Sequence, residues 1–302
     1  MPGPVSVAGR TGGAKPPSAR STLWRGDSGV RPSGSPAEPA VYLLSPAGSK
    51  EDAAYGELRG PVRPRDLPSH LPPGSLVAVR PHPAGVWIDC QSCIETTQRR
   101  LANAALALWP DLIGHGRAVD FAGKARLHGI RCIVWNARPD RERIREQLTD
   151  PADWPRMVAI WFRYRGVLLR PQIESLLEAM AAGALAHADV HGLAAQHGPP
   201  ARRLSRNFRA AGLDGVGSWF SVLRVTRIGM EIQRRPKDSI ESIALRTGYS
   251  TLSALSRRCY DDLGARPTFL RQHLGWQWML AAALRRSGID LTAGDQNRPL
   301  AD

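Results

Sequence analysis

Two short basic segments in the last third of the chain share the core Leu-Ser-Arg. The chain reads RRLSRNF over 202–208 and SALSRRCY over 253–260. If each segment is a helix, its leucine lies on the same face as the residue four positions later, which is Phe208 in the first copy and Cys259 in the second. The arginines then lie on the outer side. Because each copy follows a short helical segment and a tight turn, the pattern predicts two helix-turn-helix units.

Either copy alone fits a plainer interpretation, because amphipathic helices with arginines on their solvent side are common. Repetition of the Leu-Ser-Arg core favours two helix-turn-helix units over this plainer interpretation. The helix expected between the copies, over 216–234, is long enough to separate two such units by about one turn of DNA.

The region after residue 184 has no strand signal and predicts a run of short helices. Gly212, Gly248 and Gly264 stand where three of these helices should end, since glycine readily adopts the left-handed conformation of a helix end. Asp238 and Glu241 have the spacing of a capping box at the start of the fourth helix. The expected helices span 189–197, 201–211, 216–234, 239–247, 251–263, 267–273 and 275–286.

Residues 74–184 alternate between apolar runs and helical patterns, which is typical of βαβ units and a parallel sheet. The expected strands span 75–80, 131–136 and 157–162, and the expected helices span 94–109, 138–148 and 171–183. The fold class expected is therefore mixed. An α/β domain over 74–184 precedes an all-α domain over 185–286.

Both ends of the chain read as tails. Residues 1–73 contain 13 of the 25 prolines, and such composition buries too little apolar surface to offset the entropy of ordering. We expect this segment to be mostly disordered, with Val41–Leu44 as an apolar island, and residues 287–302 to form a flexible tail.

The charge of the chain points to a polyanionic partner. Its formal net charge is +14, and residues 201–302 hold 17 Lys and Arg against 9 Asp and Glu. Basic residues gain affinity for phosphates by releasing counterions, so nucleic acid is the favoured partner. Codon bias of a GC-rich genome is the alternative source of the arginines. With no membrane-length apolar run, no secretory signal and too few cysteines for a disulfide framework, we expect a cytoplasmic protein.

Residues 189 to about 273 resemble the DNA-binding domain of the AraC/XylS family of transcriptional regulators, which has two helix-turn-helix units joined by a long helix. The first-unit pattern, L-S-R-x-F-R followed by Gly, is met by residues 204–209 and Gly212. The arginine of the connecting helix is met by Arg224. The second-unit pattern and its closing G-x-x-P-x-x-x-R are met by Ile243, Ala244, Gly248, Tyr249, Leu255, Arg257, Gly264, Pro267 and Arg271.

The resemblance implies a sequence-specific transcriptional regulator with no catalytic activity and no cofactor, associated with the nucleoid. Its partners would be double-stranded promoter DNA, RNA polymerase and a second copy of the chain. The residues implied to face the major groove are Arg202, Ser205, Arg206 and Arg209 in the first unit, and Thr251, Ser253, Ala254, Ser256 and Arg257 in the second. Arginine can bind guanine bidentately, so the first helix is expected to give the sharper base preference. The alternative for any one arginine is a phosphate contact.

The second unit departs from the family pattern near its end. Cys259 stands where the family usually has Phe, and the smaller residue leaves a space that we expect Leu252 or Tyr260 to fill. Leu252, three positions before Leu255, is expected to extend the buried face of the helix. Tyr260, Asp261 and Asp262 follow where the family often has basic residues, which should weaken phosphate contact there.

The 74–184 domain does not resemble the cupin-like barrel that often accompanies this family. It is more similar to a receiver domain, the α/β type switched by phosphorylation. The run SLVAVRPHP has no acidic pair for Mg²⁺, and Asn136 stands where a phosphoryl acceptor is expected. A degenerate receiver-like domain used for regulation or dimerisation is the interpretation we favour.

Cys90 and Cys93 form a CxxC motif ahead of an expected helix. Structural thiols are the favoured interpretation. One alternative is a redox pair, because a helix N-terminus lowers the pKa of a thiol, and this would make the protein a redox-responsive DNA-binding sensor. Another is a metal site completed by Cys132 or a histidine, although no second pair of cysteines is present. A non-specific DNA-binding protein is the remaining alternative for the whole chain.

Overall fold

The computed structural model describes residues 41–44, 58–62, 67, 71–110, 113–135, 141–165, 170–187, 190, 201–210 and 212–288. These residues all belong to one compact unit, Ala37–Asp302. Most of the two expected tails, Asn136 and nearly all of the helix expected at 189–197 lie outside the described residues.

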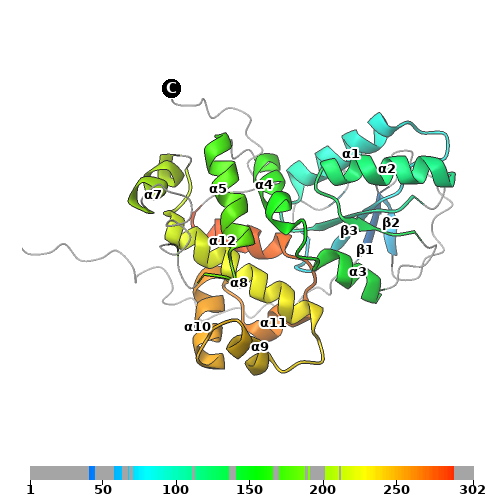
Figure 1. Cartoon of the computed structure of the whole chain (residues 1–302). Helices are drawn as coiled ribbons and strands as arrows, with labels where there is room; N and C mark the ends of the chain where they lie inside the picture. The colour runs from blue at the N-terminus through cyan, green and yellow to red at the C-terminus, as the bar shows by residue number, and fades with distance from the viewer. Residues whose placement is uncertain are drawn as a thin grey trace, which may run out of the picture. The chain divides into compact units, whose positions relative to one another are not determined.

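A parallel sheet forms the first part of the unit (Figure 1). Its strands are β1 (Val41–Leu44), β2 (Leu58–Val62), β3 (Leu76–Val79), β4 (Ala105–Leu108) and β5 (Cys132–Ile133). They are arranged in the order β2-β1-β3-β4-β5, one of the two common orders of doubly wound sheets. The expectation of disorder is wrong for β1 and β2, because their backbone groups pair within the sheet and β1 lies between β2 and β3.

Alternate residues of the strands pack against opposite layers of helix. Val77 and Val79 belong to a core with α1 (Trp87–Arg100) and α2 (His115–Leu127), whereas Leu76 and Ala78 pack with α3 (Arg141–Leu148). Each face of the sheet is therefore covered, as the apolar runs of its central strands require.

Two elements expected from the sequence are wrong. The helix expected at 94–109 ends at Arg100 as α1, and the segment Ala105–Leu108 is β4, whose four residues are all buried. The strand expected at 157–162 lies inside the helix α4 (Trp154–Tyr164). Both errors involve short apolar runs buried on all sides, which have no periodicity to distinguish a strand from a helix.

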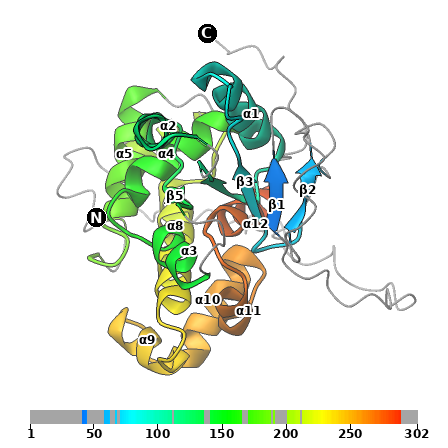
Figure 2. The same cartoon turned by 90° about the vertical axis from the view of Figure 1, so that its right-hand side faces the viewer.

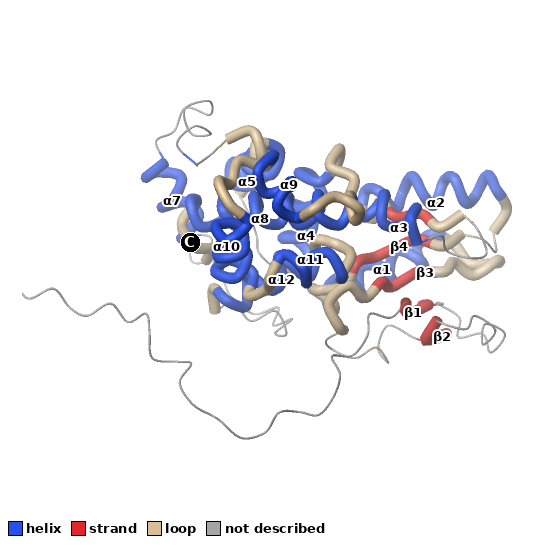
Figure 3. Tube along the Cα trace, turned by 90° about the horizontal axis from the view of Figure 1, so that it is seen from below, coloured by secondary structure: helices blue, strands red, loops and turns tan. Residues whose placement is uncertain are grey.

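After β5 every regular element that the structure describes is a helix (Figure 3). The expected helices at 138–148 and 171–183 are confirmed as α3 and α5, and those from residue 201 onward are confirmed within about two residues. The helices after α4 are α5 (Pro171–Ala182), α7 (Ala201–Ala210), α8 (Val216–Arg234), α9 (Ile240–Arg246), α10 (Leu252–Leu263), α11 (Pro267–Gln272) and α12 (Gln277–Arg286).

The glycine signals for helix ends are confirmed. Gly212, Gly248 and Gly264 have φ angles of 76°, 85° and 70°, in the left-handed region that favours glycine. The prediction of a capping box at 238–241 is wrong by one residue. The N-cap of α9 is Ser239, whose hydroxyl accepts the backbone N–H of Ser242 at 3.0 Å.

One apolar core surrounds α8 and includes helices from both sides of residue 185. Trp219 of α8 meets Phe162 of α4 edge to face, with ring centroids 5.0 Å apart. α8 and α12 pack closely at Gly229, where a Cβ would lie 2.6 Å from Met279 Sδ. Figure 2 shows α9, α10 and α11 grouped at one end of α8. Side chains of α4 and α5 therefore help to hold the helix that links α7 to α10.

Candidate nucleic-acid interface

The helices α9 and α10 form a pair with a short turn between them, and each end of α10 has its own cap. The hydroxyl of Thr251 accepts the backbone N–H of Ala254 at 3.1 Å at the start of α10. Gly264 ends the helix in the left-handed conformation. These caps satisfy backbone groups that a helix leaves unpaired, so they fix where α10 begins and ends.

Arg224 of α8 holds the turn between α9 and α10. Its Nη2 donates to the carbonyl of Thr247 at 2.7 Å, and its Nη1 donates to the carbonyl of His187. The guanidinium also lies over the ring of Tyr249, 5.6 Å from the centroid. The arginine that the sequence placed in the connecting helix is thus bound inside the protein and orients α10.

The inner face of α10 consists of Leu255, Cys259 and Leu263, all buried. Burial raises the pKa of the Cys259 thiol to about 12, so the thiol is neutral. The expectation that Leu252 or Tyr260 fills the space beside Cys259 is wrong, because their exposed fractions are 37% and 58%. Leu252 lies in the first turn of α10. Tyr260 is the residue after Cys259, so its side chain is rotated by about 100° around the helix, and the guanidinium of Arg286 lies over its ring.

Asp262 belongs to an interaction between α8 and α10. Its carboxylate accepts from the Ser221 hydroxyl of α8 and from Nε of Arg258 at 3.0 Å. Burial raises the pKa of Asp262, and these two partners oppose that shift. Arg258 compensates the charge of Asp262 within the protein, and the expectation that residues 260–262 weaken phosphate contact stays a prediction. Asp261 is exposed.

The outer face of α10 carries the residues predicted to contact DNA. Thr251, Ser253, Ala254 and Arg257 are exposed, and Ser256 is partly buried. In the part of the chain that the structure describes, no carboxylate pairs with Arg257. Its guanidinium is available to an anionic partner.

The helix α7 has the same division into inner and outer faces. Phe208 is fully buried, whereas Arg202, Arg206 and Arg209 are exposed and Ser205 is partly buried. The side chain of Leu204 and the residue Ala211 lie outside the described residues. The guanidinium of Arg209 lies close to the start of α8, where a Cβ on Gly215 would be 3.5 Å from its Nη2.

Three arginines near these helices are held in ion pairs. Arg227, Arg246 and Arg258 form ion pairs with Glu231, Asp238 and Asp262, at 3.0, 2.5 and 3.0 Å. By contrast, the arginines predicted to face DNA have no ion-pair partner among the described carboxylates: Arg202, Arg206, Arg209 and Arg257. The arginines that the motif places outward therefore have no ion-pair partner among the described carboxylates.

The sequence did not indicate that two leucines of α9 and α10 are exposed. Leu245 of α9 is 56% exposed and Leu252 of α10 is 37% exposed. Spacing alone placed Leu252 inward, because it lies three positions before the buried Leu255. The position of Leu252 in the first turn, directly after the N-cap, was the signal that could have placed it outward.

Cys90 and Cys93 lie within α1, not ahead of it, and both are buried. Burial raises their thiol pKa values to about 12 and about 11, the opposite of the depressed pKa that the redox hypothesis requires. Cys132 faces the other side of the sheet, in the core with α3. Among the described residues no cluster of Cys, His, Asp and Glu is suited to a metal ion.

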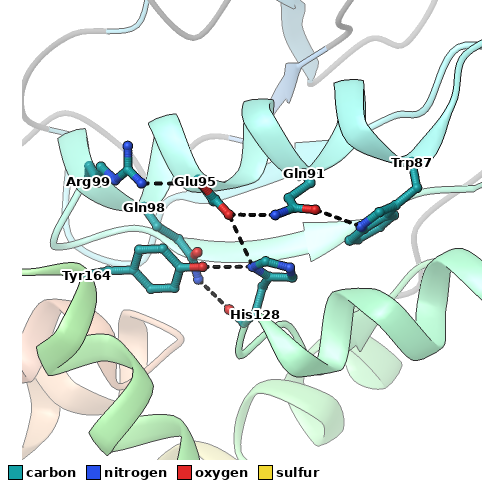
Figure 4. A network of polar contacts seen from close by, with 7 residues as sticks. All are labelled: Trp87, Gln91, Glu95, Gln98, Arg99, His128 and Tyr164. Carbon is teal, nitrogen blue, oxygen red and sulfur yellow. Dashed lines mark hydrogen bonds and ion pairs between the residues drawn. The ribbon is translucent and has the colours of Figure 1, made fainter.

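A second polar cluster joins α1 to α2 and α4 (Figure 4). Trp87, Gln91, Glu95 and Arg99 form a ladder along α1 with contacts of 3.0, 2.8 and 3.2 Å. Next to Glu95, His128 Nδ1 lies 2.7 Å from the hydroxyl of Tyr164. Burial raises the pKa of Tyr164 to about 12, so the phenol stays protonated. Each group is engaged by a neighbour, and the cluster holds α4 against the sheet domain.

No family model, no curated protein and no solved structure matches the chain. None of the helices in the described ranges has the length and apolar character needed to cross a bilayer. The likeness to AraC/XylS regulators therefore stays a prediction from sequence motifs.

Proposed function

We propose that this protein is a sequence-specific DNA-binding regulator of transcription, with α7 and α10 as its two recognition helices, as the resemblance to the AraC/XylS family implies. One observation carries the proposal. None of the nine residues predicted to face DNA is fully buried, while Phe208, Leu255 and Cys259 on the same two helices are. Apolar residues that hold the helix and outward donors that reach the groove are what a recognition helix requires.

The length of α8 supports the use of both helices on one DNA molecule. α8 has 19 residues, which corresponds to about 28 Å at 1.5 Å per residue. Successive major-groove segments on one side of DNA are roughly 34 Å apart. A linker of this length suits two adjacent major-groove contacts.

The unpaired arginines supply the chemistry of recognition. A guanidinium donates two parallel hydrogen bonds to O6 and N7 of guanine or binds a phosphate oxygen. α7 presents three of the arginines predicted to face DNA, whereas α10 presents Arg257 alone. We therefore propose that α7 contributes more of the preference for guanine.

Selection of bound duplexes from a random pool tests the proposal. The full chain is the right material, because α4 and α5 share the core of α8. We expect one preferred sequence, bound orders of magnitude more tightly than bulk DNA at physiological salt. Arg206→Ala should relax the preference at one base position by about 1–3 kcal/mol.

Arg203→Ala is the matched control, since Arg203 is exposed on the same helix but is not predicted to read a base. Loss of affinity that is equal for all sequences would assign Arg206 to a phosphate. Equal affinity of the wild-type chain for every duplex would contradict the proposal and favour a non-specific DNA-binding protein, which the net charge of +14 also suits. A change in DNA affinity after mild oxidation would favour the redox alternative.

For the sheet domain we propose a receiver-like regulatory or dimerisation role without phosphorylation. The strand order supports the likeness. A phosphoryl acceptor of this kind is a carboxylate, whereas the residues directly after β3, β4 and β5 are Arg80, Trp109 and Val134. Sedimentation equilibrium of the full chain, with and without its selected duplex, tests the dimer. A monomer under both conditions would contradict it.

A further inference from the structure

Leu252 is an apolar side chain at the part of α10 where a recognition helix approaches DNA. It is the first residue of the helix, directly after the N-cap Thr251, and is 37% exposed. Its neighbours Ser253 and Ala254 are exposed as well. In helix-turn-helix proteins the N-terminal residues of the recognition helix contact the edges of the bases.

A single exposed leucine needs no explanation in most places on a protein surface. The position of Leu252 calls for an explanation, because this residue lies in the first turn of a predicted recognition helix. The Thr251 oxygen already accepts the N–H of Ala254, and Ala254 has only a methyl group. The hydroxyls of Thr251 and Ser253 can still donate. The edge of the helix that would meet the bases therefore presents an exposed leucine and a methyl group next to two hydroxyls.

The base edges of the major groove include one apolar group, the C5 methyl of thymine. An exposed leucine that contacts this methyl removes apolar surface from water on both sides, whereas the same leucine opposite an amino or keto group would leave that group without a hydrogen bond. A leucine placed against a base edge would therefore favour thymine over the other bases.

We propose that Leu252 contacts the methyl group of a thymine, so that α10 selects thymine where α7 selects guanine. This inference rests on the DNA-binding function proposed above. It assigns a specificity role to a residue that the apolar spacing of the sequence had placed in the core.

The buried stripe of α10 allows Leu252 to be changed without disturbing the fold. Leu255, Cys259 and Leu263 are each no more than 3% exposed and provide the packing of the helix. Leu252→Ala should therefore keep the melting temperature of the wild-type chain. Leu245 offers a matched control, because it is a more exposed leucine on the neighbouring helix α9 and not on the predicted recognition helix.

Removal of the methyl group from the DNA gives a direct test. Each deoxythymidine in the half of the selected duplex bound by α10 is replaced in turn by deoxyuridine, which differs from it only in lacking that methyl group. For the wild-type chain we expect about a fourfold loss of affinity at one position, the worth of one buried methylene-sized group. Leu252→Ala should bind the thymine duplex about fourfold more weakly and show no further loss with deoxyuridine. Leu245→Ala should keep the wild-type sensitivity.

The outcomes separate this inference from the function on which it rests. If the wild-type chain selects a sequence but tolerates deoxyuridine at every position, the thymine contact is wrong and the regulator is retained. Methyl sensitivity that survives in Leu252→Ala would assign the contact to another residue and also overturn the inference. A chain with no preferred sequence would overturn both.

Discussion

The helices α7 and α10 carry the same Leu-Ser-Arg core and yet differ on both faces. At the position four residues after the leucine, α7 has the fully buried ring of Phe208 and α10 has the smaller Cys259. On its exposed side α7 has four arginines without an ion-pair partner among the described carboxylates, whereas α10 has Arg257 together with the apolar Leu252 and Ala254. The repeat preserves the division into inner and outer faces while the residues on each face change.

The two helices also differ in how their neighbours hold them. For α10 the structure shows Arg224 of α8 at the preceding turn, Arg258 bound to Asp262 and Ser221, and Nε of Arg286 donating to the Asp261 carbonyl at 3.0 Å. For α7 the described contact with the core is Phe208. Among the described residues, a large ring packs α7 against the core, whereas α10 has both its buried stripe and several arginine contacts.

Truncation of the two inner residues tests this difference most strongly. Phe208→Ala removes a fully buried ring and should lower the free energy of unfolding by about 3–5 kcal/mol. Cys259→Ala removes one buried sulfur atom and should cost about 1 kcal/mol, as small core truncations do. Denaturant unfolding of both variants measures the two values. Equal losses would show that the helices are held in the same way.

Removal of the Arg224 side chain should have the next largest effect. Arg224→Ala leaves the carbonyls of Thr247 and His187 without their donor, and each charge-assisted hydrogen bond of this kind is worth about 1.5–3 kcal/mol. Because both hydrogen bonds are only part-buried and solvent screens them, we expect a smaller total loss of about 2–3 kcal/mol in unfolding free energy, measured with denaturant. Hydrogen exchange should rise at amides of the α9–α10 turn more than in α7.

Arg234→Ala is the control for this prediction. Arg234 is exposed near the end of α8 and has no ion-pair partner in the described ranges, so its removal should change stability by less than about 0.5 kcal/mol. If Arg224→Ala is equally harmless, the turn does not depend on the arginine contact.

Much of the helical region could be predicted from the sequence because its signals are local. Val216–Arg234 is confirmed to the residue, and glycine ends three helices as expected, since a left-handed φ angle at Gly212, Gly248 and Gly264 strongly favours that residue type. The outward positions of Arg206 and Arg257 follow from helical periodicity alone.

The remaining features depend on contacts between distant residues, which periodicity does not encode. The segment at 157–162 packs as a helix in one core with α5 and α8, although its apolar run would equally suit a buried strand. Leu252 has the spacing of a core residue and is exposed, because the apolar stripe of α10 begins only at Leu255. Likewise, adjacent arginines in SRRCY look equivalent until the position of Asp262 is known.

Those adjacent arginines, Arg257 and Arg258, give the smallest and most selective prediction. Arg257→Ala should leave stability within about 0.5 kcal/mol of wild type and weaken DNA binding, with a salt dependence reduced by about one unit in slope. Arg258→Ala should do the reverse. It should keep most of the DNA affinity and lower stability by up to about 1 kcal/mol, since its partly exposed ion pair with Asp262 is screened by solvent.

The pH dependence of stability distinguishes the two variants further. Burial raises the pKa of Asp262 above its ordinary value of 3.8, and Arg258 opposes this shift, so Arg258→Ala should raise that pKa more. A raised carboxyl pKa means that the folded state binds protons more readily than the unfolded state, and stability then falls as pH rises through the interval between the two pKa values. The deficit of Arg258→Ala should therefore be full at neutral pH and disappear below about pH 4, whereas Arg257→Ala should follow wild type throughout. A deficit of Arg258→Ala that is unchanged at low pH would show that the arginine acts by packing against α8, not by compensating the charge of Asp262.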